Sequence, residues 1–232
     1  MLVPAMVIGR VRTVLNTALR WGAMQRARDA GWARYAAVES RLQLTMKQSR
    51  SNRVARFVGN ILGANLPRPV RYLEIGSFEG GSTALVYSLF DGDIRITAVD
   101  QFADYAEMPG KSLKVVEETF DANMAVIGAT DKLRKLKGRS IDHLPRLVDA
   151  KAQFDLIYID GSHHALDVMA DAVLAWQVLA PRGLMIFDDY RFDESHAGQR
   201  FTPKPAIDAF VGMMGREIEV VDVGGQVFLR RR

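Results

Sequence analysis

The segment Val70-Arg71-Tyr72-Leu73-Glu74-Ile75-Gly76-Ser77-Phe78-Glu79-Gly80-Gly81-Ser82 decides the fold of this 232-residue chain. Its first six residues favour a β-strand, and the glycines that follow predict a sharp turn into a helix. Similar strand-like runs occupy residues 94–99, 154–159 and 183–187, with a weaker run at 133–137. Helical patterns lie between them, at residues 82–90, 113–127 and 165–179. This alternation predicts a parallel sheet with helices on both faces.

The end of the chain has a different pattern. Residues 217–223 and 226–230 read as two strands, and Gly224-Gly225 between them suits a tight turn. The sequence therefore predicts that the parallel sheet closes with an antiparallel hairpin, which makes seven strands in all.

The first 60 residues are strongly basic. They hold eleven arginines and lysines against two acids, a net charge of +9, whereas the rest of the chain carries −5. Apolar positions in residues 5–64 recur at a helical period, with arginines between them. Such a face could lie on a membrane surface through residues 1–24, pack on the domain, or pack on a second subunit in a homodimer. Packing is the commonest use of this pattern, and we expect it here.

Composition sets further limits. We expect a basic helical extension over residues 1–52 and one α/β domain over residues 53–232. No apolar run reaches the roughly 18 residues of a membrane span. The absence of cysteine excludes disulfides and thiolate sites, which fits a cytoplasmic protein, with peripheral membrane association as an option. No motif or aromatic-basic interleaving supports nucleic-acid binding.

The glycine turn and the next strand end suit a nucleoside ligand. Gly76 lets a backbone approach closely, and Ser82 could either cap the helix or bind a ligand carboxylate. Asp100 ends the next strand, 24 residues after Gly76, where a carboxylate can accept both ribose hydroxyls. The turn lacks the Gly-x-Gly-x-x-Gly of dinucleotide sites and the Gly-Lys-Ser/Thr of phosphate loops.

Two acidic motifs follow later strands. Asp160-Gly161-Ser162-His163-His164 comes after residues 154–159, and Asp188-Asp189 after residues 183–187. Three converging carboxylates repel one another, and a divalent cation would relieve that repulsion. Alternatively, one carboxylate could be protonated or cap a helix. His163 could be a general base or an orienting residue.

These motifs in this order resemble the class I S-adenosylmethionine methyltransferases. The resemblance covers about residues 68–230 and is greatest to the macrocin O-methyltransferase-like branch, which is related to catechol O-methyltransferase. The motifs that carry it are Tyr-Leu-Glu74-Ile-Gly76, Ala-Val-Asp100, Leu-Lys-Gly138-Arg-Ser140, Tyr-Ile-Asp160-Gly-Ser-His163 and Ile-Phe-Asp188-Asp189-Tyr. It implies a Rossmann-like, doubly wound fold.

The resemblance also implies a role for each matching residue. Gly76, Ser77, Phe78 and Ser82 would line the methionine part of the cofactor, and Glu74 would support their loop. Asp100 would hold the ribose, and Gln101 and Ser140 would reach the adenine. Asp160, also beside the cofactor, would join Asp188 and Asp189 as ligands of a divalent cation such as Mg²⁺. His163 would stand where the catechol enzymes place a lysine base. The family's aromatic-acidic pair after the histidine is replaced by Ala165-Leu166.

The function predicted is therefore O-methylation of a small-molecule or glycan hydroxyl, with or without a metal. The loop over residues 190–203 is the expected lid or acceptor contact. Two alternatives stay open at this point, a nicotinamide-dependent oxidoreductase and a non-catalytic binding module of the same fold.

Overall fold

The computed structural model describes residues 5–45, 51–102, 113–192 and 202–232. Its strands form one seven-stranded sheet in the order β3-β2-β1-β4-β5-β7-β6, in which β7 runs antiparallel to both of its neighbours. The strands are β1 (Val70–Ile75), β2 (Ile94–Asp100), β3 (Leu133–Lys137), β4 (Phe154–Ile159), β5 (Leu179–Phe187), β6 (Ile218–Val223) and β7 (Val227–Arg231). The predicted doubly wound sheet with its closing hairpin is confirmed.

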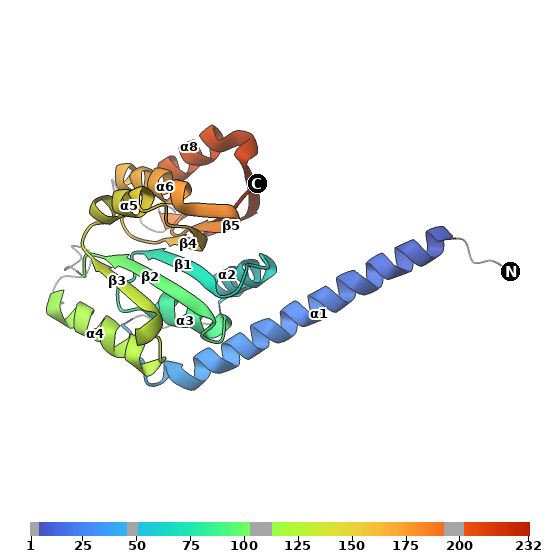
Figure 1. The fold of residues 1–232 in the computed structure, drawn as a ribbon, viewed down its shortest axis with the longest axis horizontal. Coiled ribbons are helices and arrows are strands. Elements are labelled where there is room, and N and C mark those ends of the chain that lie inside the picture. Colours follow the sequence, from blue (N-terminus) through green and yellow to red (C-terminus); the bar gives the residue numbers. More distant parts are fainter. Residues whose placement is uncertain (1–4, 46–50, 103–112, 193–201) are drawn as a thin grey trace.

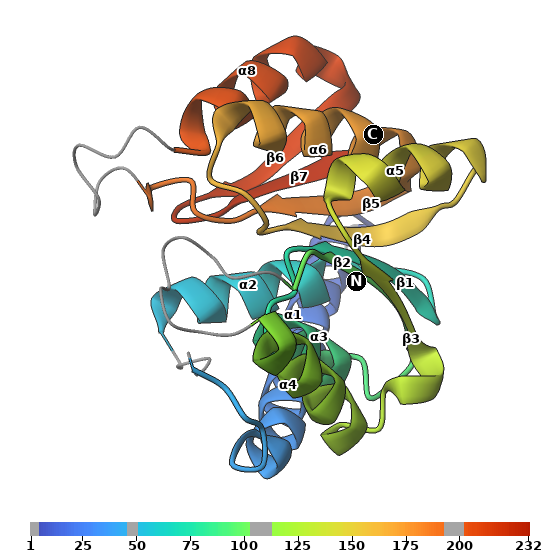
Figure 2. The same ribbon diagram turned by 90° about the vertical axis from the view of Figure 1, so that its left-hand side faces the viewer.

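Helices cover both faces of this sheet (Figures 1 and 2). Helices α2, α3 and α4 lie on one face, and α5, α6 and α8 lie on the other. The helices are α1 (Ala5–Glu39), α2 (Asn52–Gly63), α3 (Gly81–Leu89), α4 (Leu113–Val126), α5 (Ser140–Asp149), α6 (Ala165–Val178) and α8 (Lys204–Met214). Each face has its own apolar core, and the sheet separates the two.

Two helices and half of one strand are absent from the sequence prediction. Helix α5 contains Pro145, which reads as a helix breaker, and α8 begins at Lys204-Pro205. Strand β5 begins at Leu179 and not at residue 183, although Arg182 takes a left-handed φ of 62°. Pro181-Arg182-Gly183 reads as a turn, and these residues lie in an irregularity of the strand, between the pairs Phe154–Leu179 and Leu156–Leu184.

Helix α1 has two parts that behave differently. Its second half packs on α3, where Trp32 and Tyr35 are buried and a Cβ at Gly31 would lie 2.7 Å from Leu89. Its first half leaves the domain and projects away from it (Figure 1). The expected packing on the domain is therefore found only in the second half. The proposed boundary at residue 52 stays a prediction, and apolar side chains from both sides of it share one core.

The length and apolarity that a bilayer-spanning helix requires are not combined in any helix of the described part of the chain.

Candidate functional site

A cavity of about 560 Å³ opens at the carboxyl ends of β1 and β2 and extends beside the helices α5 and α6. The predicted site residues in its wall are Gly76, Asp100, Gln101, Ser140 and His163. Glu74, Ser77, Phe78, Ser82 and Asp160 lie outside that wall. The carboxyl edge of parallel strands is the usual ligand site of such sheets, so the cavity stands where the sequence placed a cofactor.

The turn after β1 requires glycine for a reason that sequence reasoning missed. Gly76 has a φ of 87°, and a Cβ there would lie 2.1 Å from the carbonyl oxygen of Asp160. The close approach is therefore to the end of β4 rather than to a ligand. Gly80, with a φ of 81°, is the N-cap of α3, so Ser82 does not cap that helix.

Glu74 supports the same turn from inside the protein. The Ser82 hydroxyl donates a hydrogen bond of 2.5 Å to its carboxylate, and the Thr83 hydroxyl donates a second. The side chain is fully buried, and burial raises its pKa to about 7 against the opposing effect of these hydrogen bonds. The carboxylate thus ties the first turn of α3 to strand β1.

The buried Glu74 should make stability depend on pH. Its pKa is higher in the folded chain than in the unfolded chain, so the folded state is favoured while the carboxyl is protonated, and this advantage is lost as the pH rises from about 4.5 to about 7. We expect Glu74→Gln to remove this component, which amounts to about 3 kcal/mol at most. Urea unfolding of both proteins at pH 5 and pH 8 measures it; equal pH dependence in the two would contradict the assignment.

Asp100 joins the turn to the end of β2. One carboxylate oxygen accepts the backbone N–H groups of Ser77 and Phe78, each at 2.8 Å, and the other accepts that of Phe102 at 2.6 Å. Phe78 takes a left-handed φ of 46°, which these bonds help to hold. Asp100 therefore shapes the cavity wall, whether or not it also meets a ribose.

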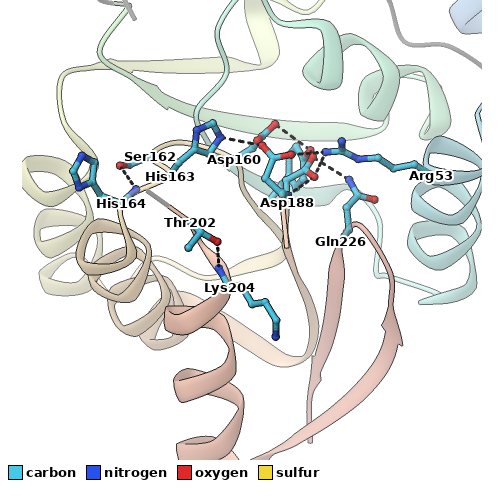
Figure 3. A network of polar contacts seen from close by, with 11 residues as sticks. Arg53, Asp160, Ser162, His163, His164, Asp188, Thr202, Lys204 and Gln226 are labelled. Atoms are coloured by element: carbon cyan, nitrogen blue, oxygen red, sulfur yellow. Dashed lines mark hydrogen bonds and ion pairs between the residues drawn. The ribbon is translucent and has the colours of Figure 1, made fainter. Parts of the chain in front are cut away.

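Asp160, Asp188 and Asp189 lie near one another at the ends of β4 and β5, as predicted, and the Arg53 guanidinium contacts two of them. Figure 3 shows Arg53 beside Asp188, with Asp160 near by. Arg53 of α2 forms an ion pair with Asp188 and lies 3.2 Å from Asp189. The Tyr158 hydroxyl donates to Asp188, and its oxygen lies 3.1 Å from an Asp160 oxygen. The Gln226 amide donates to Asp188 at 3.1 Å.

The three carboxylates differ in proton affinity. Burial, followed by the charges of neighbouring aspartates, raises the pKa values of Asp160 and Asp188. Burial acts in the same direction on Asp189, but its contacts with His163 and Arg53 bring its pKa below the usual range. Of the three, Asp189, next to the histidine, therefore holds its negative charge most readily.

His163 connects the acidic cluster to the cavity. Its Nε2 lies 3.0 Å from an Asp189 oxygen, and its ring stacks on Phe192 with centroids 4.1 Å apart. Asp189 has a φ of 53°, a conformation that aspartate and asparagine tolerate better than other side chains. The strained residue after β5 thus fixes the ring orientation of His163.

Sequence reasoning missed two residues of this region. Arg53 was counted only as one of eleven basic residues, and its partners lie more than 130 positions away. Asp171 of α6 lines the cavity, and burial raises its pKa to about 6. No local motif marks either residue. The predicted lid at residues 190–203 lies mostly outside the described residues.

The predicted metal site differs from the arrangement of the side chains in the structure. In the described part of the chain, no group of three or more His, Cys, Asp or Glu side chains is arranged to hold a metal ion. The predicted ligands do cluster, but Asp188 and Asp189 contact the Arg53 guanidinium. A metal role for Asp160, Asp188 and Asp189 stays a prediction.

A curated relative shares part of the sequence. The O-methyltransferase hkm8 of Aspergillus hancockii is 32% identical over 123 residues, which is 53% of this chain and 43% of that protein. The chain thus matches less than half of that relative's length.

Solved structures share the fold. The O-methyltransferase TomG from Streptomyces achromogenes, in complex with S-adenosylmethionine, has a TM-score of 0.59 at 17% identity, covering 87% of this chain and 88% of that one. An O-methyltransferase from Bacillus cereus, in complex with S-adenosylhomocysteine, has a TM-score of 0.58 at 17% identity, covering 89% and 91%. The profile of a family described as "methyltransferase domain" matches residues 73–190, more than half of the chain. The chain belongs to this methyltransferase domain family.

Proposed function

We propose that the chain transfers a methyl group from S-adenosylmethionine to a hydroxyl oxygen. The observation that carries this proposal is the position of His163, which lines the cavity at the strand ends and contacts the acidic cluster through Asp189. The family match and the relative named as an O-methyltransferase support it. The absence of a dinucleotide turn disfavours a nicotinamide oxidoreductase.

In this reaction the protein forms no covalent bond to either substrate; it aligns them and removes a proton. The acceptor oxygen attacks the methyl carbon in line, at about 3 Å, while the S–CH₃ bond breaks and S-adenosylhomocysteine leaves. The acceptor's proton has to be removed, and His163 would accept it. If Nε2 donates to Asp189, Nδ1 carries the lone pair of the neutral ring, and Asp189 stabilises the imidazolium that forms.

The roles implied for the cofactor residues belong to this proposal. Asp100 would accept the ribose hydroxyls, and Gln101 and Ser140 would border the adenine, since all three line the cavity. The methionine end would meet the turn over residues 76–78, with Ser82 and Asp160 near it. Glu74 would act through the turn that it supports.

A divalent cation does not fit the site as the described side chains are arranged. Aspartate oxygens are suitable ligands for Mg²⁺, but those of Asp188 are engaged by Arg53, Tyr158, Gln226 and the backbone N–H of Asp189. Arg53 already supplies the positive charge that three converging carboxylates need.

The acceptor that we propose is a small molecule that carries a hydroxyl group, with a glycan as one chemical form of it. We further propose a cytoplasmic enzyme. A homodimer is a second possible state of the protein, and light scattering of the wild type and of variants in helix α1 measures it.

Calorimetric titration tests the cofactor assignment. We expect the protein to bind S-adenosylhomocysteine with a dissociation constant in the micromolar range, about 1,000-fold tighter than NADH. The reason is that Asp100 can accept a ribose, whereas the turn after β1 lacks the motif that binds a dinucleotide. Asp100→Ala should weaken S-adenosylhomocysteine binding at least tenfold. Tight binding of NADH, or of neither ligand, would reject the proposal.

A further inference from the structure

We propose that residues 5–21 of α1 bind the surface of a membrane that contains anionic phospholipids, with the helix lying parallel to that surface. This proposal concerns where the protein works and does not depend on the reaction that it catalyses.

The helix is continuous, and only part of it belongs to the domain. It runs from Ala5 to Glu39 without interruption. The second half is fixed to α3 by buried aromatic residues and by the Arg34 guanidinium, which donates to the Ser88 carbonyl at 2.8 Å. The first half projects from this anchored part, with no described element beside it in Figure 1. Residues 5–21 therefore extend an anchored helix into open space.

The sequence of this projecting part has two sides. Apart from Met6, its large apolar positions fall within an arc of roughly 160°, at 3.6 residues per turn. They are Val7, Ile8, Val11, Val14, Leu15, Leu19 and Trp21. Thr13, Asn16, Thr17 and Arg20 occupy the opposite side, while Arg10 and Arg12 fall at the two borders of the apolar arc. This is the pattern of interfacial helices, whose border arginines reach lipid headgroups.

The positive charge of this segment favours binding to an anionic lipid surface over binding to a second copy of the chain. Residues 1–28 hold five arginines and no acidic residue. A second copy packed on the apolar arc would bring another basic segment close to this one, and the like charges would repel. Anionic headgroups attract such a segment by about 1 kcal/mol per arginine near the surface. The basic charge and the apolar arc thus favour the same partner.

The test uses the full-length protein and two kinds of vesicle, phosphatidylcholine alone and an equimolar mixture with phosphatidylglycerol. In flotation assays we expect the wild type to bind the anionic vesicles at least tenfold more tightly than the neutral ones, with weaker binding as NaCl is raised. Val11→Ser with Leu15→Ser should lower binding to anionic vesicles by about 10- to 100-fold, since two apolar side chains leave the lipid.

A matched variant tests whether binding depends on the apolar side of the helix in particular. Thr13→Ser with Thr17→Ser changes the same number of residues on the polar side, keeps the charge, and should bind as the wild type does. Circular dichroism of all three proteins, together with titration of S-adenosylhomocysteine, verifies that the domain is intact.

Three outcomes would overturn the proposal. They are equal binding to neutral and anionic vesicles, an equal loss in both double variants, and no vesicle binding. Light scattering then identifies the rival explanation, because a dimer that the Val11→Ser and Leu15→Ser variant converts to a monomer would assign the apolar arc to a second copy of the chain.

Discussion

Replacing His163 by alanine should lower kcat by about 10²- to 10⁴-fold, the usual contribution of a positioned general base. The dissociation constant for S-adenosylhomocysteine should stay within about threefold of the wild-type value, since no bond between the imidazole and the cofactor is part of the proposed mechanism. Single-turnover methyl transfer from labelled S-adenosylmethionine gives the rate, and calorimetry gives the affinity.

We expect kcat to fall while cofactor affinity is kept because the two sides of the His163 ring have different neighbours. One side contacts Asp189, whose pKa is kept low by His163 and Arg53 against the effect of burial, so that an anion is available to stabilise the imidazolium. The other side borders the cavity. Asp189→Asn should therefore lower kcat as well, by a smaller factor, because the ring keeps a hydrogen-bond partner but loses the charge.

A matched histidine separates this effect from a general loss of an imidazole. His143 of α5 contacts the Lys137 carbonyl at 2.9 Å and lies outside both the cavity wall and the acidic cluster. His143→Ala should leave kcat nearly unchanged. If His163→Ala weakens cofactor binding as much as it lowers kcat, the histidine has a structural role and another group takes the proton.

Local signals predicted most of the sheet. Strands β1, β3 and β4 begin and end where the sequence placed them, because each is a short β-rich run bounded by turn residues. The sharp turn after β1 was predicted from its glycines, and Gly76 and Gly80 take positive φ values there. Their purpose was not predictable, since the contact of Gly76 with the Asp160 carbonyl depends on the pairing of β1 with β4.

Elements whose residues give conflicting local signals escaped prediction. Pro145 concealed α5, and the turn-like Pro181-Arg182-Gly183 concealed the start of β5. In α5 the burial of Leu144 and Leu147 outweighs the local preference. In β5 the turn-like residues form an irregularity between two pairs with β4, so the strand begins before them.

In the site, too, the residues at strand ends were predictable from the sequence, whereas their partner from a distant part of the chain was not. Three aspartates at strand ends can be placed together from topology, because parallel strands bring their carboxyl ends to one edge. The partner of those aspartates cannot, because Arg53 comes from a helix that precedes the sheet in the chain. The only trace in the sequence is the charge imbalance, a basic first quarter against an acidic remainder.

Replacing Arg53 by methionine should both destabilise the protein and create a response to divalent cations. At pH 8 we expect the free energy of unfolding to fall by about 1–2 kcal/mol, less than the 3–5 kcal/mol of a fully buried pair, because half of the Arg53 side chain is exposed. The pKa values of Asp160 and Asp188 are raised in the folded protein, so both take up protons as the pH falls. The loss should therefore be smaller at pH 5 than at pH 8.

The divalent cation distinguishes loss of charge from loss of packing. Without the guanidinium, three carboxylates face one another, and Mg²⁺ or Mn²⁺ would relieve their repulsion. Thermal unfolding of Arg53→Met at pH 8 should shift upward by several degrees in 5 mM MgCl₂ relative to EDTA, about 1 kcal/mol of stabilisation. The wild type, whose cluster already holds Arg53, should respond much less.

Arg56 supplies the control on the same helix. It pairs with Asp222 of β6, away from the three aspartates, and its ion pair is open to solvent. Arg56→Met should cost at most about 1 kcal/mol and should gain no response to Mg²⁺. If the wild type is stabilised by Mg²⁺ as strongly as Arg53→Met, the guanidinium does not take the place of a cation, and Asp160, Asp188 and Asp189 then act as the metal ligands that the sequence resemblance implied.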